Sequence, residues 1–142
     1  ADAFAATSIS HIHLPEGLEI IEDNTFGYCE SLIDTITIPS TVTQIKSRAF
    51  AECKQLTAVV LSENLQEIQG EAFVNCYSLD YILCLNPEPP MLDQSAFNGV
   101  EKNNFTLVVP EGAVEAYRKQ LHKTVWEGWV IRSAIEELSE IY

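Results

Sequence analysis

The chain has 142 residues, a length that suits one domain of ordinary size rather than two. Hydrophobic residues make up 46% and charged residues 20% of the sequence, so the chain can bury a core and is not intrinsically disordered. Acidic residues outnumber basic ones by 21 to 8, and the net charge of −13 excludes nucleic acid as a partner because the phosphate backbone is also negative.

A repeat of about 23 residues dominates the sequence from Ile12 onwards. The segments IHLPEGLEIIEDNTFGYCESL from Ile12, ITIPSTVTQIKSRAFAECKQL from Ile36 and VVLSENLQEIQGEAFVNCYSL from Val59 align, with equivalent positions 24 and then 23 residues apart. The columns that keep this register are Leu18, Val42, Leu65; Ile21, Ile45, Ile68; Phe26, Phe50, Phe73; Cys29, Cys53, Cys76; and Leu32, Leu56, Leu79. A unit this short cannot bury its own hydrophobic side, so neighbouring units are expected to stack into one continuous core.

Each unit contains a short stretch with the alternation of a β-strand. In the segment from Leu56 to Leu61, Val59 and Leu61 are expected to point inward, and Ala58 and Val60 outward. Stacked units would align these strands in a parallel ladder. The predicted rungs of that ladder lie at Leu14, Ile38, Leu61, Cys84 and Val109.

The ends of the chain depart from the regular repeat, and the whole of 1–142 is expected to form a single domain. Residues 1–11, with Ala3, Phe4, Thr7 and Ile9, match the end of a preceding repeat, so we expect the chain to begin inside a longer array. Regular repeats occupy 12–84, and a degenerate terminal repeat with the proline-rich connection 85–91 occupies 85–110. A C-terminal cap is expected over 111–142.

The cap is predicted to begin with an amphipathic helix. Val114, Tyr117 and Leu121 recur at helical spacing after Pro110 and Gly112, and acidic residues precede basic ones. Trp126, Trp129, Val130 and Ile131 are candidates to cover the last rung, and 134–142 would form a second, weaker helix.

The pattern LxxLxLPxxLxxIxxxAFxxCxxL resembles the BspA-like, or treponemal-type, leucine-rich repeat family. It is carried by Leu32 to Leu56 and by Leu56 to Leu79, with Thr25 and Ser62 as departures, and the resemblance covers roughly residues 9–132. It implies a leucine-rich-repeat solenoid with short parallel strands, little helix in the repeats and a helical cap. It also implies a bacterial cell-surface or secreted protein that binds host or microbial proteins. The repeated residues are scaffold, so no binding residue carries over.

Four cysteines raise the alternatives of a disulfide framework, a zinc site or buried free thiols. Cys29, Cys53 and Cys76 occupy one repeat position, so their side chains should run parallel up the stack. Parallel side chains give poor disulfide geometry and do not converge on a metal ion. Cys84 shares the inward position of Leu61. We therefore favour buried free thiols that act as small hydrophobic groups.

Two histidines and the acidic excess are the other candidates for ligand binding. His11 and His13 project from the same side of one strand, a spacing that suits a metal pair, a pH-sensitive contact or an ordinary exposed face. The acidic residues form no calcium-binding loop, so they indicate either a solvated face or a preference for basic partners. The sequence calls for no metal and no cofactor.

The outward positions of the strands are the candidate binding residues. They change from polar to apolar along the stack, which is typical of a contact surface, unless the cap or the 85–91 connection covers the last two. In order they are His11, His13, Thr35, Thr37, Ala58, Val60, Tyr81 and Leu83.

Three functions are compatible with these features. The leading hypothesis is a non-enzymatic protein-binding or adhesion module at the cell surface or secreted, whose partner is a host or microbial extracellular protein. The alternative is a structural C-terminal end of a longer repeat array, or an accessory domain, whose activity lies upstream. An enzyme is the third, although no nucleophile with a base, phosphate loop or metal cluster is present.

No apolar run reaches the roughly 20 residues of a membrane span, so no membrane insertion is expected of this segment.

Overall fold

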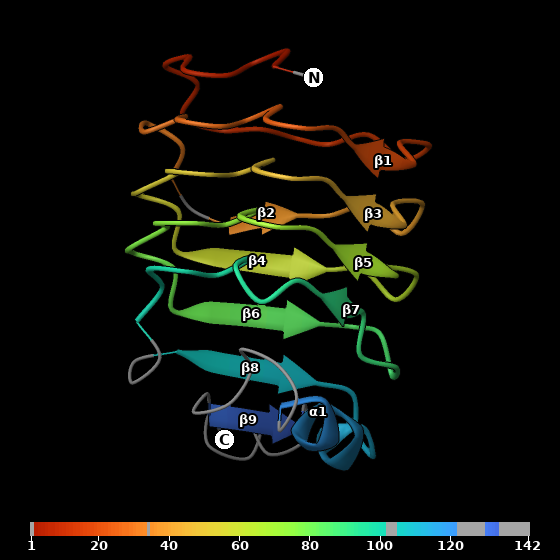
Figure 1. Ribbon diagram of the computed structural model, residues 1–142. Helices are drawn as coiled ribbons and strands as arrows, with labels where there is room; N and C mark the ends of the chain where they lie inside the picture. Colours follow the sequence, from red (N-terminus) through yellow and green to blue (C-terminus); the bar gives the residue numbers. More distant parts are fainter. Residues whose placement is uncertain (1, 34, 102–104, 122–129, 134–142) are drawn as a thin grey trace.

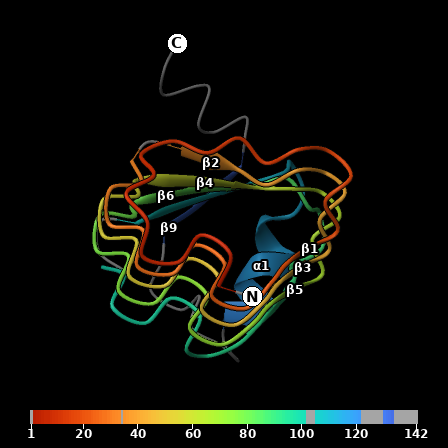
Figure 2. The ribbon, with the colours of Figure 1, turned by 90° about the horizontal axis from the view of Figure 1, so that it is seen from above.

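The structure is a computed structural model that describes residues 2–33, 35–101, 105–121 and 130–133. Successive repeats wind into a solenoid whose strands stack in parallel, one turn below the next (Figure 1). The strands form two separate sheets on two sides of the solenoid (Figure 2). The buried side chains of all turns form one core between the sheets. The predicted solenoid of stacked parallel strands is therefore confirmed.

The first sheet contains the strands that the sequence predicts. It has the order β2-β4-β6-β8-β9, and every neighbouring pair is parallel. The bounds are β2 Thr35–Thr37, β4 Ala58–Leu61, β6 Tyr81–Cys84, β8 Thr106–Val109 and β9 Val130–Ser133. Val59 and Leu61 are buried while Ala58 and Val60 are half-buried, so the predicted inward and outward positions are confirmed in β4.

The rungs at the two ends of this sheet differ from the prediction. Residues around Leu14 form no strand, although Ile33 N–H donates to the Ser10 carbonyl oxygen and Leu14 packs against the core. At the other end, Val130 and Ile131 belong to β9, which adds a rung that the repeat pattern does not show.

A second sheet of two-residue strands was not predicted. It has the order β1-β3-β5-β7, and all its pairs are parallel. The bounds are β1 Ile20–Ile21, β3 Gln44–Ile45, β5 Glu67–Ile68 and β7 Met91–Leu92. The column of Ile21, Ile45 and Ile68 is its buried face. Met91, outward on the last strand of this sheet, is 69% exposed.

The third side of the solenoid consists of stacked turns that hold the phenylalanine column. Phenylalanine rings of successive turns stack face to face, with centroids 5.3 Å apart between Phe26 and Phe50 and 5.2 Å apart between Phe50 and Phe73. The column continues to Phe4 and to Phe97. The prediction that Phe26, Phe50 and Phe73 form one column is therefore confirmed.

The backbone on both sides of each phenylalanine has an unusual conformation. Arg48 and Glu52 stand two residues before and two residues after Phe50. Their φ values are +59° and +61°, in the left-handed region that residues other than glycine rarely adopt. The same is true around Phe26 and Phe73, and glycine takes the position two residues after Phe97. This conformation lets Phe50 N–H donate to the Ala72 carbonyl oxygen of the next turn, at 2.8 Å. Hydrogen bonds between turns thus compensate for the local strain.

Helix α1, Val114–Leu121, packs against the C-terminal end of the core and confirms the predicted helix (Figures 1 and 2). Its Tyr117 is fully buried beneath the last repeats. The Tyr117 hydroxyl donates to the Asn86 carbonyl oxygen at 2.8 Å and lies 2.9 Å from the Cys84 sulfur. The predicted cap residues Trp126 and Trp129, and the predicted second helix at 134–142, lie outside the described residues.

Removing only the Tyr117 hydroxyl tests this contact between helix and solenoid. Tyr117→Phe is expected to lower the free energy of unfolding by about 1 kcal/mol, because the part-buried Asn86 carbonyl oxygen loses its donor. Urea unfolding of both proteins measures the difference. Equal stability would show that water replaces the hydroxyl and that the cap does not depend on this bond.

Candidate functional site

The outward side of the first sheet holds the predicted binding residues in two columns. Strand pairing aligns Thr35, Ala58, Tyr81 and Thr106 in one column, and Thr37, Val60, Leu83 and Val108 in the other. We call this surface the strand face. Thr35 and Thr37 are exposed, as are His11 and His13 on the preceding turn, whereas Val60, Tyr81 and Leu83 are half-buried. The predicted change from polar to apolar positions along the stack is present.

The connection that follows β6 leaves the strand face and runs to the second sheet. Leu85 N–H donates to the Leu61 carbonyl oxygen, the Asn86 amide donates to the Leu65 carbonyl oxygen, and Met91 begins β7. Tyr81 and Leu83 keep part of their surface exposed. Val108, next in the column after Leu83, is only 1% exposed, so the apolar part of the strand face ends there.

A hollow of about 260 Å³ lies at the polar end of the strand face. Its wall combines hydroxyl, imidazole and carboxylate groups with aliphatic side chains, contributed by Ile12, His13, Leu14, Glu16, Thr35, Thr37 and Pro39. The hydroxyl of Ser40 donates to Glu16 Oε2 at 3.0 Å and orients this carboxylate. The sequence singled out His13, Thr35 and Thr37, but it gave no reason to select Glu16.

Negative charge borders the strand face. Glu16, Glu63 and Asp80 are exposed at its edges, and in the described part of the chain none of them forms an ion pair. The basic side chains of the repeats lie elsewhere: Arg48 pairs with Glu71, and Lys54 pairs with Glu30 at 3.3 Å. Carboxylates therefore border the polar and middle parts of this face, while Arg132 on β9 is aligned with Val108 at its far end.

Cys29, Cys53 and Cys76 form the predicted column, and all four cysteines are free and buried. Each thiol of the column donates to the phenylalanine carbonyl oxygen of the preceding turn, as Cys53 does to Phe26 at 3.2 Å and Cys76 to Phe50 at 3.1 Å. Burial, reinforced by the neighbouring Cys29, raises the pKa of Cys53 to about 12. Burial also raises the pKa values of Cys76 and Cys84. These three thiols therefore stay neutral and are poor nucleophiles at ordinary pH.

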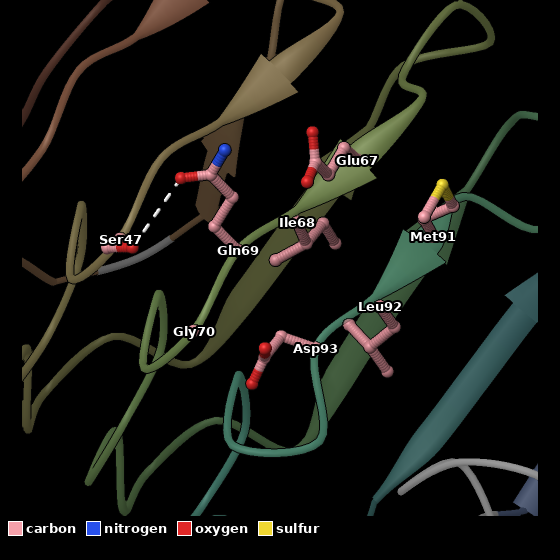
Figure 3. A pocket seen from close by; sticks show the side chains of 8 residues that line it. All are labelled: Ser47, Glu67, Ile68, Gln69, Gly70, Met91, Leu92 and Asp93. Atoms are coloured by element: carbon pink, nitrogen blue, oxygen red, sulfur yellow. Dashed lines mark hydrogen bonds between the residues drawn. The ribbon is translucent and has the colours of Figure 1, made fainter.

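His11 and His13 are exposed, and no group of three or more His, Cys, Asp or Glu side chains in the described residues is placed to hold a metal ion. A larger hollow, of about 530 Å³, lies over the second sheet (Figure 3). It is lined by Ser47, Glu67, Ile68, Gln69, Gly70, Met91, Leu92 and Asp93. Sequence reasoning missed this hollow, because it identified Ile21, Ile45 and Ile68 only as a repeat column and predicted no second sheet.

Comparison with protein families shows a match over most of the chain. The family described as BspA type leucine rich repeat region matches residues 1–114, in six copies. The matched part includes every strand of the second sheet and the strands of the first sheet up to β8. Comparisons with the curated proteins and with the solved structures gave no significant match.

Proposed function

The chain belongs to the BspA-type leucine-rich repeat family, and on this premise we propose that it is a protein-binding module that works in adhesion. Leucine-rich repeat solenoids are generally scaffolds without catalytic activity, and they typically mediate contacts between proteins. The observation that carries the proposal is the strand face, where half-buried Val60, Tyr81 and Leu83 adjoin exposed polar residues. Extended sheet surfaces of this kind are where solenoids bind their partners.

The proposal includes a non-enzymatic role and a place at the bacterial cell surface or in the secreted fraction. The buried, neutral thiols support a non-enzymatic role. Family membership supports the location, since proteins with these repeats are often surface-associated. In the described residues no helix combines the length and the apolar character needed to cross a membrane. The proposed partner is a host or microbial extracellular protein.

Substitution of Tyr81 tests this function. Tyr81→Ala is expected to weaken binding of an extracellular partner by about 2 kcal/mol or more, as truncation of an interface aromatic does. The half-buried ring contributes less to the core than an inward residue, so the fold should persist. Binding to a panel of purified host extracellular proteins, measured with the immobilised chain, gives the comparison.

Tyr77→Ala is the matched control, because Tyr77 is 54% exposed on the turn before β6 and lies off the strand face. It should leave binding unchanged. If no partner depends on Tyr81, the strand face is not a binding surface and the segment serves as a structural end of a repeat array.

A further inference from the structure

The hollow at the polar end of the strand face has the features of a site for a long basic side chain. Its aliphatic wall, from Ile12, Leu14 and Pro39, suits the methylene stem of lysine or arginine. The Glu16 carboxylate offers several acceptor positions, and Ser40 occupies one of them. An ammonium or guanidinium group at this carboxylate would form a charge-assisted hydrogen bond, and the Thr35 and Thr37 hydroxyls supply further acceptors.

The apolar part of the strand face lies a fixed distance from this hollow. Thr37, Val60 and Leu83 are aligned on three successive strands. Neighbouring strands are about 4.8 Å apart, so Leu83 lies about 10 Å from Thr37 along the stack. An extended chain advances about 3.3 Å per residue and therefore covers this distance in three residues.

We propose that the strand face binds an extended protein segment in which a lysine or arginine stands about three residues from an aliphatic or aromatic residue. The basic side chain enters the hollow beside Glu16, and the apolar side chain packs on Leu83 and Tyr81. This rests on the protein-binding function proposed above and adds the chemistry of the partner. Charge complementarity supports it, because the border residues Glu63 and Asp80 are acidic and without ion pairs among the described residues.

A random library of twelve-residue peptides displayed on phage provides the probe. Peptides selected on the wild-type chain are expected to share a lysine or arginine three residues from an aliphatic or aromatic residue. Fluorescence anisotropy of the synthetic peptides then measures their affinity. Glu16→Gln is expected to weaken binding about tenfold, the effect of losing one charge-assisted hydrogen bond. Thermal unfolding should be unchanged, because Glu16 is exposed.

Two further variants make the test specific. Glu22→Gln removes the same charge at an exposed position beyond β1, off the strand face, and should change affinity less than twofold. Glu16→Lys should reject the selected peptides and accept versions in which glutamate replaces the basic residue. Equal losses from Glu16→Gln and Glu22→Gln would overturn the proposal, since binding would then follow net charge alone.

The outcomes separate this proposal from the protein-binding function itself. The selected peptides could lose affinity for Tyr81→Ala and yet contain no basic residue, or bind Glu16→Gln as tightly as the wild type. Either result would overturn the proposed basic segment but would still support the strand face as a binding surface. Selected peptides that are insensitive to Tyr81→Ala, or a library that yields no binder, would contradict both.

Discussion

Phe73→Ala is expected to lower the free energy of unfolding by about 3–5 kcal/mol, the cost of emptying a buried aromatic position. Phe73 is fully buried inside the phenylalanine column, between Phe50 and Phe97. Its ring centroid lies 5.2 Å from that of Phe50 and 5.1 Å from that of Phe97. Truncation therefore removes two stacking contacts and leaves a cavity between turns that cannot collapse without shifting the backbone hydrogen bonds. Urea unfolding followed by circular dichroism measures the loss.

Phe4→Ala is the matched control at the end of the same column. Phe4 stacks on Phe26 alone at 5.5 Å, and 46% of its surface is exposed, so its loss should cost about 1 kcal/mol. If both substitutions cost the same, the column does not act as a continuous buried stack and the repeats are held together by their sheets.

The first sheet and the phenylalanine column were predictable because both follow from a repeat read directly in the sequence. Residues at equivalent positions in a stacked repeat must lie one above another, so Phe26, Phe50 and Phe73 had to form a column once the solenoid was accepted. The period of two in a strand then separates inward Leu61 from outward Val60.

The second sheet and the turns were not predictable by the same reasoning. Strands of two residues, such as Gln44–Ile45, are too short to show an alternation, and their glutamine and glutamate residues favour no strand. Positive φ values are expected at glycine, yet here Arg48 and Glu52 adopt them because hydrogen bonds to the next turn require it. The controlling interactions are between turns, so no local signal reveals them.

Only part of the candidate site was predictable from the sequence, for the same reason. Thr35, Thr37, Val60, Tyr81 and Leu83 follow from strand alternation alone. The hollow depends on Glu16 and Pro39, which come from the corners after two successive rungs and meet only when the turns stack. To predict a surface formed by corner residues one must know the backbone geometry of the corner, and the repeat pattern does not contain that information.

Alkaline pH is expected to destabilise the protein through its buried thiols. The pKa of Cys53 rises from 9.0 to about 12 because burial disfavours the thiolate. A raised folded-state pKa means that the stabilisation is complete below the unfolded-state pKa and is lost as pH rises from there toward the folded-state pKa. Cys53 alone should therefore cost about 2 kcal/mol between pH 9 and pH 11. Cys76 and Cys84 shift in the same direction and steepen the loss.

Cys53→Val isolates this contribution, because valine is accommodated three residues after phenylalanine in the last turn, where Val100 follows Phe97 and is buried. The variant loses the thiol hydrogen bond to Phe26 and starts from a different stability at neutral pH, about 1 kcal/mol lower. Its stability should then fall less steeply than that of the wild type when urea unfolding is repeated from pH 8 to pH 11 with a reductant present. Lysines and tyrosines titrate equally in both proteins, so the difference between the two slopes belongs to Cys53 and to its effect on the neighbouring Cys76. Parallel slopes would mean that this thiol ionises as readily in the folded chain as in the unfolded one, and that the cysteine column is open to solvent.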